Sequence, residues 1–173
     1  MTPQLTLHPL RPEDAVDILT FERDNRAFFA HIVGDRGDQF FAEYPRIHAG
    51  LLAEMERGES LLYLVRDAPG RLVGRVNFTK LPSGSASLGY RFAEAVGGQG
   101  YATTAVAQAL TLAAQAGVRE VRAIVAVENP ASRRVLEKVG FSPLTAGQDV
   151  AFVQRNGRSI PVQGYGLTLP QPR

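Results

Sequence analysis

The pattern of apolar and polar residues predicts one strand and then several helices in the first third of the chain. Leu5 to Leu10 alternates between the two classes, which is typical of a strand. Pro12 suits the first turn of a helix. On that helix one side carries four residues, three of them apolar: Ala15, Ile18, Leu19 and Glu22. We expect the helix to extend to Phe29, whole or with one break.

A second helical segment follows the loop Gly34–Gly37. Asp38 is suited to cap it, and its apolar residues continue at helical spacing to about Arg57. Pro45 lies inside this segment. It predicts either a kink or a split there, because proline lacks the amide hydrogen that a helix interior needs.

The middle of the chain changes to the pattern of strands. Leu61 to Val65 is a nearly continuous apolar run, which is typical of a strand buried on both faces. Turns at Ala68–Gly70 and Pro82–Gly84 separate it from two further candidates, Leu72 to Phe78 and Ala86 to Phe92. These three strands predict an antiparallel meander.

A glycine-rich turn then leads into a helix. The turn Gly97–Gly100 is followed by apolar residues at helical spacing: Ala102, Ala105, Val106, Ala109, Leu110 and Ala113. Glycines let the backbone approach an anion closely, and the N–H groups at a helix start favour a phosphate. A P-loop would need a Lys where Tyr101 stands, and a dinucleotide fingerprint fails at Thr103, which is neither Gly nor Ala. The pattern therefore predicts a pyrophosphate cradle made of backbone alone.

A strand and a short helix follow this element. Val121 to Val127 is apolar, and a strand that follows a full helix should lie parallel to the strand before it. Asn129 and Pro130 suit the N-cap and the first position of a short helix, which should end at Gly140.

The C-terminal segment predicts a hairpin. Asp149 to Gln154 and Ile160 to Leu169 are its two strands, and Asn156–Gly157 is a typical two-residue hairpin turn. We expect Pro161 to limit how much of the last strand can pair.

Composition narrows the classes of function. The net charge of +2 comes without a basic stripe, which argues against nucleic acid as a ligand. There is no Cys, and His8, His31 and His48 are isolated, so we expect no metal site. No apolar run approaches ~20 residues, and the N-terminus lacks a signal-peptide pattern. We therefore expect one domain over residues 1–173, cytoplasmic and without a membrane partner, as a monomer or homodimer.

Two sequence blocks resemble the GNAT family of acyl-CoA-dependent N-acetyltransferases. The first is Gly98-Gln99-Gly100-Tyr101-Ala102-Thr103 at a helix start. The second joins Asn129-Pro130-Ala131-Ser132 to Val135-Leu136-Glu137-Lys138-Val139-Gly140-Phe141. Within the family the chain looks most like the branch of bacterial ribosomal-protein N-terminal acetyltransferases. Leu7 to Asp14, Gly89–Tyr90 and Asn156–Gly157 are similar to other parts of that branch.

The resemblance implies an α+β fold with helices on both faces of a mixed, mostly antiparallel sheet. The sheet would have six to seven strands and be splayed between its fourth and fifth. Acetyl-CoA would lie in the splay, with its pantetheine beside Tyr90, Arg91 and Phe92. Asn129 and Ser132 would lie near the thioester. The pyrophosphate would be bound by the backbone N–H groups of Gly98, Gln99, Gly100, Tyr101, Ala102 and Thr103.

Transfer in this family is direct, because a neutral amine attacks the thioester carbonyl and no enzyme nucleophile is needed. The resemblance implies catalytic roles for Asn129 and Ser132, the latter as a hydroxyl that could stabilise or protonate the thiolate. Tyr165 is equally compatible with a place in the core and with a phenol that faces the site.

The chain departs from the family pattern in three places. Ser87 and Pro161 stand where carboxylates are common, and Gly97 stands where a basic residue or glutamine often opens the phosphate motif. The usual candidates for a general base are therefore missing. The remaining acids are typical of solvated surface residues: Glu94, Glu128 and Asp149. The proton could leave through water, or no base is needed for an amine of low pKa such as a protein N-terminus.

The sequence leaves three hypotheses for function. The first is an acetyl-CoA-dependent N-acetyltransferase that acts on a primary amine, a protein N-terminus among them. The second is an acetyltransferase for a small amine such as an amino acid, a polyamine or an antibiotic. The third is a non-catalytic acyl-CoA-binding module, which the changes at Ser87 and Pro161 favour. Acceptor choice is expected to depend on the segment Phe21 to Arg57.

Overall fold

The structure is a computed structural model that describes residues 2–80, 82–144, 151–155 and 157–170. The strands are β1 (Leu5–Pro9), β2 (Ser60–Asp67), β3 (Leu72–Lys80), β4 (Ser85–Phe92), β5 (Glu120–Ala126), β6 (Ser142–Pro143), β7 (Ala151–Arg155) and β8 (Arg158–Thr168). The α-helices are α1 (Ala15–Asp24), α2 (Arg26–Val33), α3 (Asp38–Ala42), α4 (Tyr44–Glu56), α5 (Tyr101–Gln115) and α6 (Pro130–Lys138). Short 3-10 turns lie at Pro12–Asp14, Pro82–Gly84 and Glu94–Val96.

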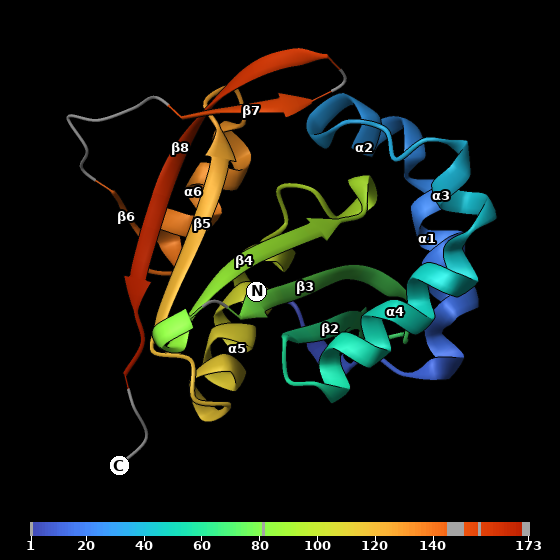
Figure 1. Ribbon diagram of the computed structural model, residues 1–173, viewed down its shortest axis with the longest axis horizontal. Coiled ribbons are helices and arrows are strands. Elements are labelled where there is room, and N and C mark those ends of the chain that lie inside the picture. The colour runs from blue at the N-terminus through green and yellow to red at the C-terminus, as the bar shows by residue number, and fades with distance from the viewer. Residues whose placement is uncertain (1, 81, 145–150, 156, 171–173) are drawn as a thin grey trace.

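The described strands form one sheet in the order β1-β2-β3-β4-β5-β8-β6, and β7 pairs with β8 (Figure 1). Every pair is antiparallel except β4 with β5. This confirms the mixed, mostly antiparallel sheet and the meander of β2 to β4. The described residues form eight strands, one more than the upper end of the expected six to seven. Strand β6 has only two residues, too few for a readable period.

The sheet splays between β4 and β5. The two strands pair only over Ser85–Ser87 and Glu120–Arg122, and beyond these residues they diverge (Figure 1). The expected splay is therefore present. It opens a V whose floor is the short parallel pairing and whose walls are the two strand ends.

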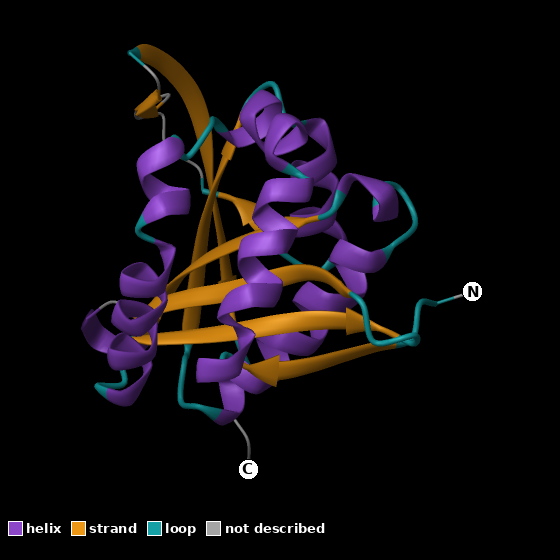
Figure 2. Ribbon diagram, turned by 90° about the vertical axis from the view of Figure 1, so that its right-hand side faces the viewer, coloured by secondary structure: helices purple, strands orange, loops and turns teal. Residues whose placement is uncertain are grey.

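Helices pack on both faces of the sheet. Alternate residues of β2 belong to two separate apolar clusters: Leu61 and Val65 pack with the α5 side, whereas Leu62 and Leu64 pack with α1 and α4. Helix α5 contacts β1 to β4, and α4 contacts β2 on the opposite face. A view turned by 90° shows the helices packed around the sheet (Figure 2). No helix in the described part of the chain is long and apolar enough to cross a bilayer.

The N-terminal helices break where the sequence allowed it. A single residue, Asn25, separates α1 from α2. The long segment expected after the loop is split into α3 and α4, and Pro45 lies in the first turn of α4, where a missing N–H costs little. The expected cap at Asp38 was wrong. Gly37 holds that position, and Asp38 is the first helical residue, with a carboxylate 2.8 Å from Arg26 Nη1.

The terminal hairpin pairs β7 with β8 as expected, but Pro161 does not limit it. Pro161 pairs with Phe152 in β7, and its carbonyl oxygen accepts a hydrogen bond from the Val127 N–H at 3.0 Å. A proline lacks only the donor, so its acceptor still serves the sheet. Asn156 of the predicted turn lies outside the described residues; Gly157 has φ 73°.

Candidate active site

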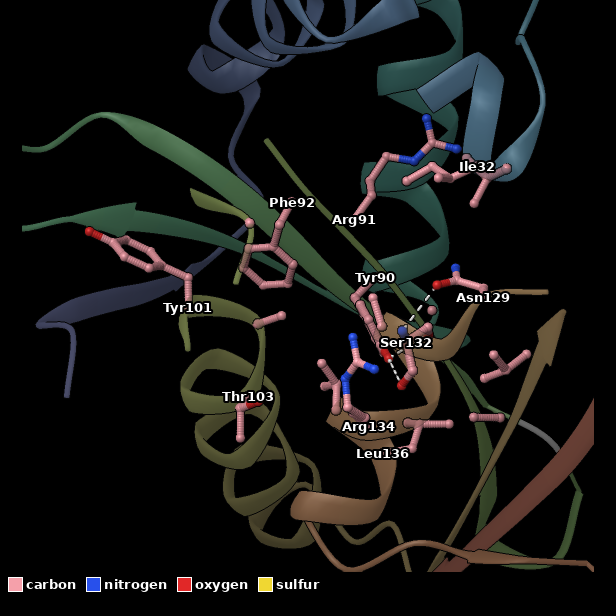
Figure 3. A pocket seen from close by; sticks show the side chains of 18 of the residues that line it. Ile32, Tyr90, Arg91, Phe92, Tyr101, Thr103, Asn129, Ser132, Arg134 and Leu136 are labelled. Carbon is pink, nitrogen blue, oxygen red and sulfur yellow. Dashed lines mark hydrogen bonds between the residues drawn. The ribbon is translucent and has the colours of Figure 1, made fainter. Parts of the chain in front are cut away.

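A cavity of about 520 Å³ lies where β4 and β5 diverge (Figure 3). Its lining comes from five segments: the glycine turn with the start of α5, the end of β4, the end of β5, α6, and α2. The cavity therefore reaches from the α5 face of the sheet to the face that α2 covers.

The glycine turn forms the head of the cavity. Gly98 and Gly100 have φ of 72° and 82°, the left-handed region that favours glycine. Gly100 is the N-cap of α5, and among the described residues no side chain caps this helix start. Residues from Gly97 to Thr103 line the cavity, apart from Gln99, whose side-chain amide donates to the Ala95 carbonyl at 2.8 Å. Backbone N–H groups and the positive end of the helix dipole thus face the cavity.

The side chains of β4 alternate between the two faces of the sheet. Tyr90 and Phe92 pack with the core on the α5 side, whereas Arg91 points the other way, toward Ile32 on α2 (Figure 3). Arg91 Nη1 donates to Glu22 at 2.9 Å, and its guanidinium lies 4.6 Å from the ring centroid of Phe29. Of these three expected cofactor residues, Arg91 therefore directs its side chain away from the α5 face, and only its backbone can lie along a ligand there.

Asn129 and Ser132 lie at the start of α6, opposite the end of β4. The Asn129 side-chain oxygen accepts a hydrogen bond from the Ser132 N–H at 3.1 Å, which confirms the predicted N-cap. The Ser132 hydroxyl lies 2.8 Å from the Tyr90 hydroxyl, which also donates to the Ser132 carbonyl at 3.2 Å (Figure 3). Burial raises the pKa of Tyr90 to about 12, although its bond to Ser132 acts in the opposite direction. The phenol is therefore neutral at physiological pH.

Tyr165 lies away from these groups. Its side chain is 2% exposed, it belongs to the main core cluster, and it is not among the residues that line the cavity. Burial raises the pKa of its hydroxyl. Of the two interpretations that the sequence left open, this packing supports a place in the core.

None of the described residues that line the cavity is an acid or a histidine. Glu94 and Glu128 are exposed and do not line it, and Asp149 lies outside the described residues. Ser87 leaves β4 without a carboxylate at the position where the family often has one.

Two features of the cavity were not found from the sequence. Arg134 and Lys138 on α6 add positive charge to its lining, and Figure 3 shows Arg134 on the side of α6 that faces α5. The sequence contained the information to predict this, since residues 131, 134, 135 and 138 follow helical spacing along one face. The second feature is the apolar lining from α2, made by Phe28, Ile32 and Val33. Asn25 fixes the start of this helix, because its side-chain oxygen accepts from the Glu94 N–H at 3.1 Å.

Comparisons with known proteins agree with this geometry. A sequence profile described as acetyltransferase (GNAT) domain matches residues 4–142. No curated protein sequence gives a match.

Among solved structures, the chain is similar to an acetyl transferase from Salmonella typhimurium that modifies the N-terminal serine of ribosomal protein L7/L12, with TM-score 0.84 and 20% identity over 98% of this chain and 97% of that one. It is similar to Mycobacterium smegmatis RimJ in complex with CoA-disulfide, with TM-score 0.81 and 24% identity over 95% and 81%. A third is a spermidine N-acetyltransferase from Vibrio cholerae in complex with CoA and spermine, with TM-score 0.77 and 22% identity over 96% of both chains. At these identities the likeness shows the shared fold.

Proposed function

The chain belongs to the GNAT acetyltransferase family, and we propose that it transfers the acetyl group of acetyl-CoA to a protein N-terminus. Family membership makes it an acyltransferase that uses acetyl-CoA. The observation that carries the proposal is the glycine turn at the head of the cavity in the splay. Strand β8 lies beside β5 in the same sheet, so we treat residues 1–173 as one domain.

The residues present fit the diphosphate of coenzyme A. Gly98 and Gly100 leave the backbone open to a close approach, because a side chain placed on Gly98 would meet no heavy atom within 4 Å. The N–H groups from Gly98 to Thr103 would bind the phosphate oxygens. Arg134 and Lys138 would add positive charge to the same side of the cavity. The end of β4, with Tyr90 and Phe92, would hold the pantetheine arm.

Acetyl-CoA, when bound, supplies an activated acyl group on a thioester. The amine nitrogen forms a bond to the carbonyl carbon, the carbon–sulfur bond breaks, and the thiolate takes up a proton. We assign the Ser132 hydroxyl to stabilise or protonate this thiolate, with Asn129 ordering the helix start on which it lies. The neutral Tyr90 phenol holds Ser132 in place at 2.8 Å. Binding amine and thioester in one cavity contributes to rate by orientation.

The composition of the cavity lining favours an amine that needs no strong base. Among the described residues no carboxylate or imidazole lines the cavity, so we propose that the ammonium proton leaves through water or that the amine arrives already neutral. A protein N-terminus has a pKa of about 7.7–8.0, whereas a lysine-type amine has one of about 10.4. At neutral pH a far larger share of N-terminal amines is therefore already neutral and ready to attack.

The test is a thiol-release assay with acetyl-CoA over a panel of acceptors. The panel contains peptides with free N-termini, the same peptides with blocked N-termini and an internal lysine, free amino acids, and spermidine. We expect release of CoA with free N-termini and little with blocked ones. Turnover only with spermidine or other small amines would move the assignment to a small-molecule acetyltransferase. Binding of CoA without turnover on any amine would contradict the enzymatic proposal.

A further inference from the structure

Four charged residues meet behind β4, on the face that α1 and α2 cover. Glu22 on α1 is 1% exposed, and three arginines surround its carboxylate. Arg91 lies at 2.9 Å, Arg36 at 3.3 Å and Arg75 at 3.5 Å. The cluster thus holds two more positive than negative charges. Burial is the largest cause of a fall in the pKa of Arg91 to about 10. The charges that change this pKa most belong to the other three members of the cluster.

The two nearby acids on the loop and α3 are already paired. Asp35 and Asp38 bind Arg26 at 2.7 Å and 2.8 Å, at the surface. Two of the cluster's buried atoms, Glu22 Oε1 and Arg75 Nε, form no hydrogen bond within the described residues, although they face each other as an ion pair. Their unused hydrogen-bonding capacity can be met by ordered water.

This cluster borders the cavity on the face of the sheet that points away from α5. Arg91 lines the cavity beside Ile32, across from Asn129 (Figure 3). Arg36 and Arg75 line a second cavity of about 170 Å³ on the same face of the sheet. The two cavities lie on neighbouring strands, because Gly89 lines the first and its partner Asn77 lines the second. The Asn77 side-chain amide lies over Gly89, 3.2 Å from the position of an added Cβ, and so forms the boundary between the two cavities.

We infer that the acceptor is an amine that carries a carboxylate close to its amino group, and that Arg91 binds this carboxylate while Arg36 and Arg75 strengthen its field. The inference rests on the proposed acyl transfer and adds the charge of the acceptor. A guanidinium has five N–H donors in a fixed fork, so Arg91 can bind a second carboxylate while Nη1 stays on Glu22. A cationic acceptor such as a polyamine would instead bring further positive charge against three guanidiniums.

The experiment compares kcat/KM for three N-terminal peptides that differ only at their second residue: Ala-Glu-Ala, Ala-Gln-Ala and Ala-Lys-Ala, all as C-terminal amides. We expect the glutamyl peptide to exceed the lysyl peptide by roughly tenfold or more, the factor that about 1.4 kcal/mol produces. Free alanine against alaninamide shows whether a main-chain carboxylate serves equally well. The preference should shrink as salt rises toward about 1 M, where the Debye length is about 3 Å.

The variant Arg91→Gln should reduce the ratio of glutamyl to lysyl peptide to near one. The matched control is Arg57→Gln, because Arg57 is an exposed arginine whose pair with Glu59 lies outside both cavities. It should keep the wild-type ratio. If Arg91→Gln does not fold, the salt dependence of the wild-type enzyme decides.

The outcomes separate this inference from the proposed function. Turnover with equal rates on all three peptides, or a preference for the lysyl peptide or spermidine, overturns the inference and leaves the acetyltransferase intact. A preference that survives in Arg91→Gln also overturns it. No turnover on any acceptor, with CoA bound, overturns both.

Discussion

The two sides of the splayed sheet are built from different parts of the chain. On the side of α5 the groups that face the cavity are mostly backbone, and the helix packs through small residues, with Ala105, Ala109 and Ala113 fully buried. On the side of α1 and α2 the groups are long charged side chains, gathered around the buried carboxylate of Glu22. One side is made by a single local turn, whereas the other is made by four segments that meet only in the folded protein.

Because one side is built from backbone and the other from buried charges, the two sides tolerate different substitutions. A site made of backbone N–H groups survives most changes of side chain but not the addition of one at a glycine with positive φ. A site made of buried charges survives changes of neighbouring backbone but not the loss of the one opposite charge, because uncompensated buried charges are costly. Substitutions in the charged cluster should therefore lower stability most, whereas substitutions in the glycine turn should lower the affinity for CoA most.

The largest effect is expected for Glu22→Gln. The change keeps the shape of the side chain and removes the one carboxylate that, among the described residues, pairs with Arg36, Arg75 and Arg91. The free energy of unfolding should fall by about 3 kcal/mol, as for other buried pairs that lose one partner. Chemical denaturation measures it.

Glu59→Gln is the matched control for this change. Glu59 pairs with Arg57 at 2.7 Å, closer than any of the contacts of Glu22, but its side chain is 54% exposed. Its loss should leave the denaturation midpoint where it was, because exposed ion pairs add little. Equal effects of the two substitutions would mean that the cluster around Glu22 is not a buried network in solution.

The next effect is expected for Gly100→Val, on the opposite side of the sheet. A β-branched residue at φ 82° strains the helix start and covers the N–H groups that face the cavity. Binding of CoA should weaken by about 100-fold, equivalent to about 2.7 kcal/mol, in isothermal calorimetry.

Gly117→Val is the control that separates the effect of backbone strain in α5 from the effect on the binding site. Gly117 has φ 87° at the other end of the same helix, with no heavy atom near the position of a side chain. It should destabilise the fold to a similar degree and leave the affinity for CoA unchanged. Loss of affinity in both variants would show that helix strain, and not the glycine turn, controls binding.

The backbone side of the site could be predicted because its information is local. The period of apolar residues located β2 to β5 and α5, two glycines marked the turn, and Asn129 before Pro130 marked the cap that the structure contains. Each of these depends on residues within a few positions of one another.

The side-chain cluster could not be predicted because its members are far apart in the sequence. Arg36 lies in a polar loop, Arg75 and Arg91 are single polar residues on two strands, and nothing in their neighbours indicates that the three meet. One signal was available. Glu22 falls on the apolar side of its helix, and an acid at such a position predicts a buried carboxylate that needs cationic partners. The sequence does not say which cations these are.

The smallest effect is expected for Tyr90→Phe, which tests the link between β4 and the start of α6. The change removes the hydroxyl that lies 2.8 Å from Ser132 without changing the apolar ring. We expect kcat to fall about threefold, equivalent to roughly 0.7 kcal/mol for one hydrogen bond, whereas Ser132→Ala should cost more. Tyr63→Phe, a half-buried phenol on β2 outside this cavity, is the control.

The dependence of kcat/KM on pH tests whether the Tyr90 phenol is protonated during catalysis. Because the pKa of Tyr90 is about 12, its phenol stays protonated through the assay range. With the Ala-Gln-Ala amide, whose binding does not depend on the charge of Arg91, kcat/KM should therefore rise as the acceptor amine loses its proton and then stay level to about pH 10. An unshifted tyrosine, with a pKa of about 10, would give a fall that begins below that value. Tyr90→Phe should keep the rise and lower the level part. A fall above pH 9 in the wild-type enzyme that disappears in Tyr90→Phe would show that the phenol ionises in this range, and the buried, neutral hydroxyl assigned to Tyr90 would be wrong.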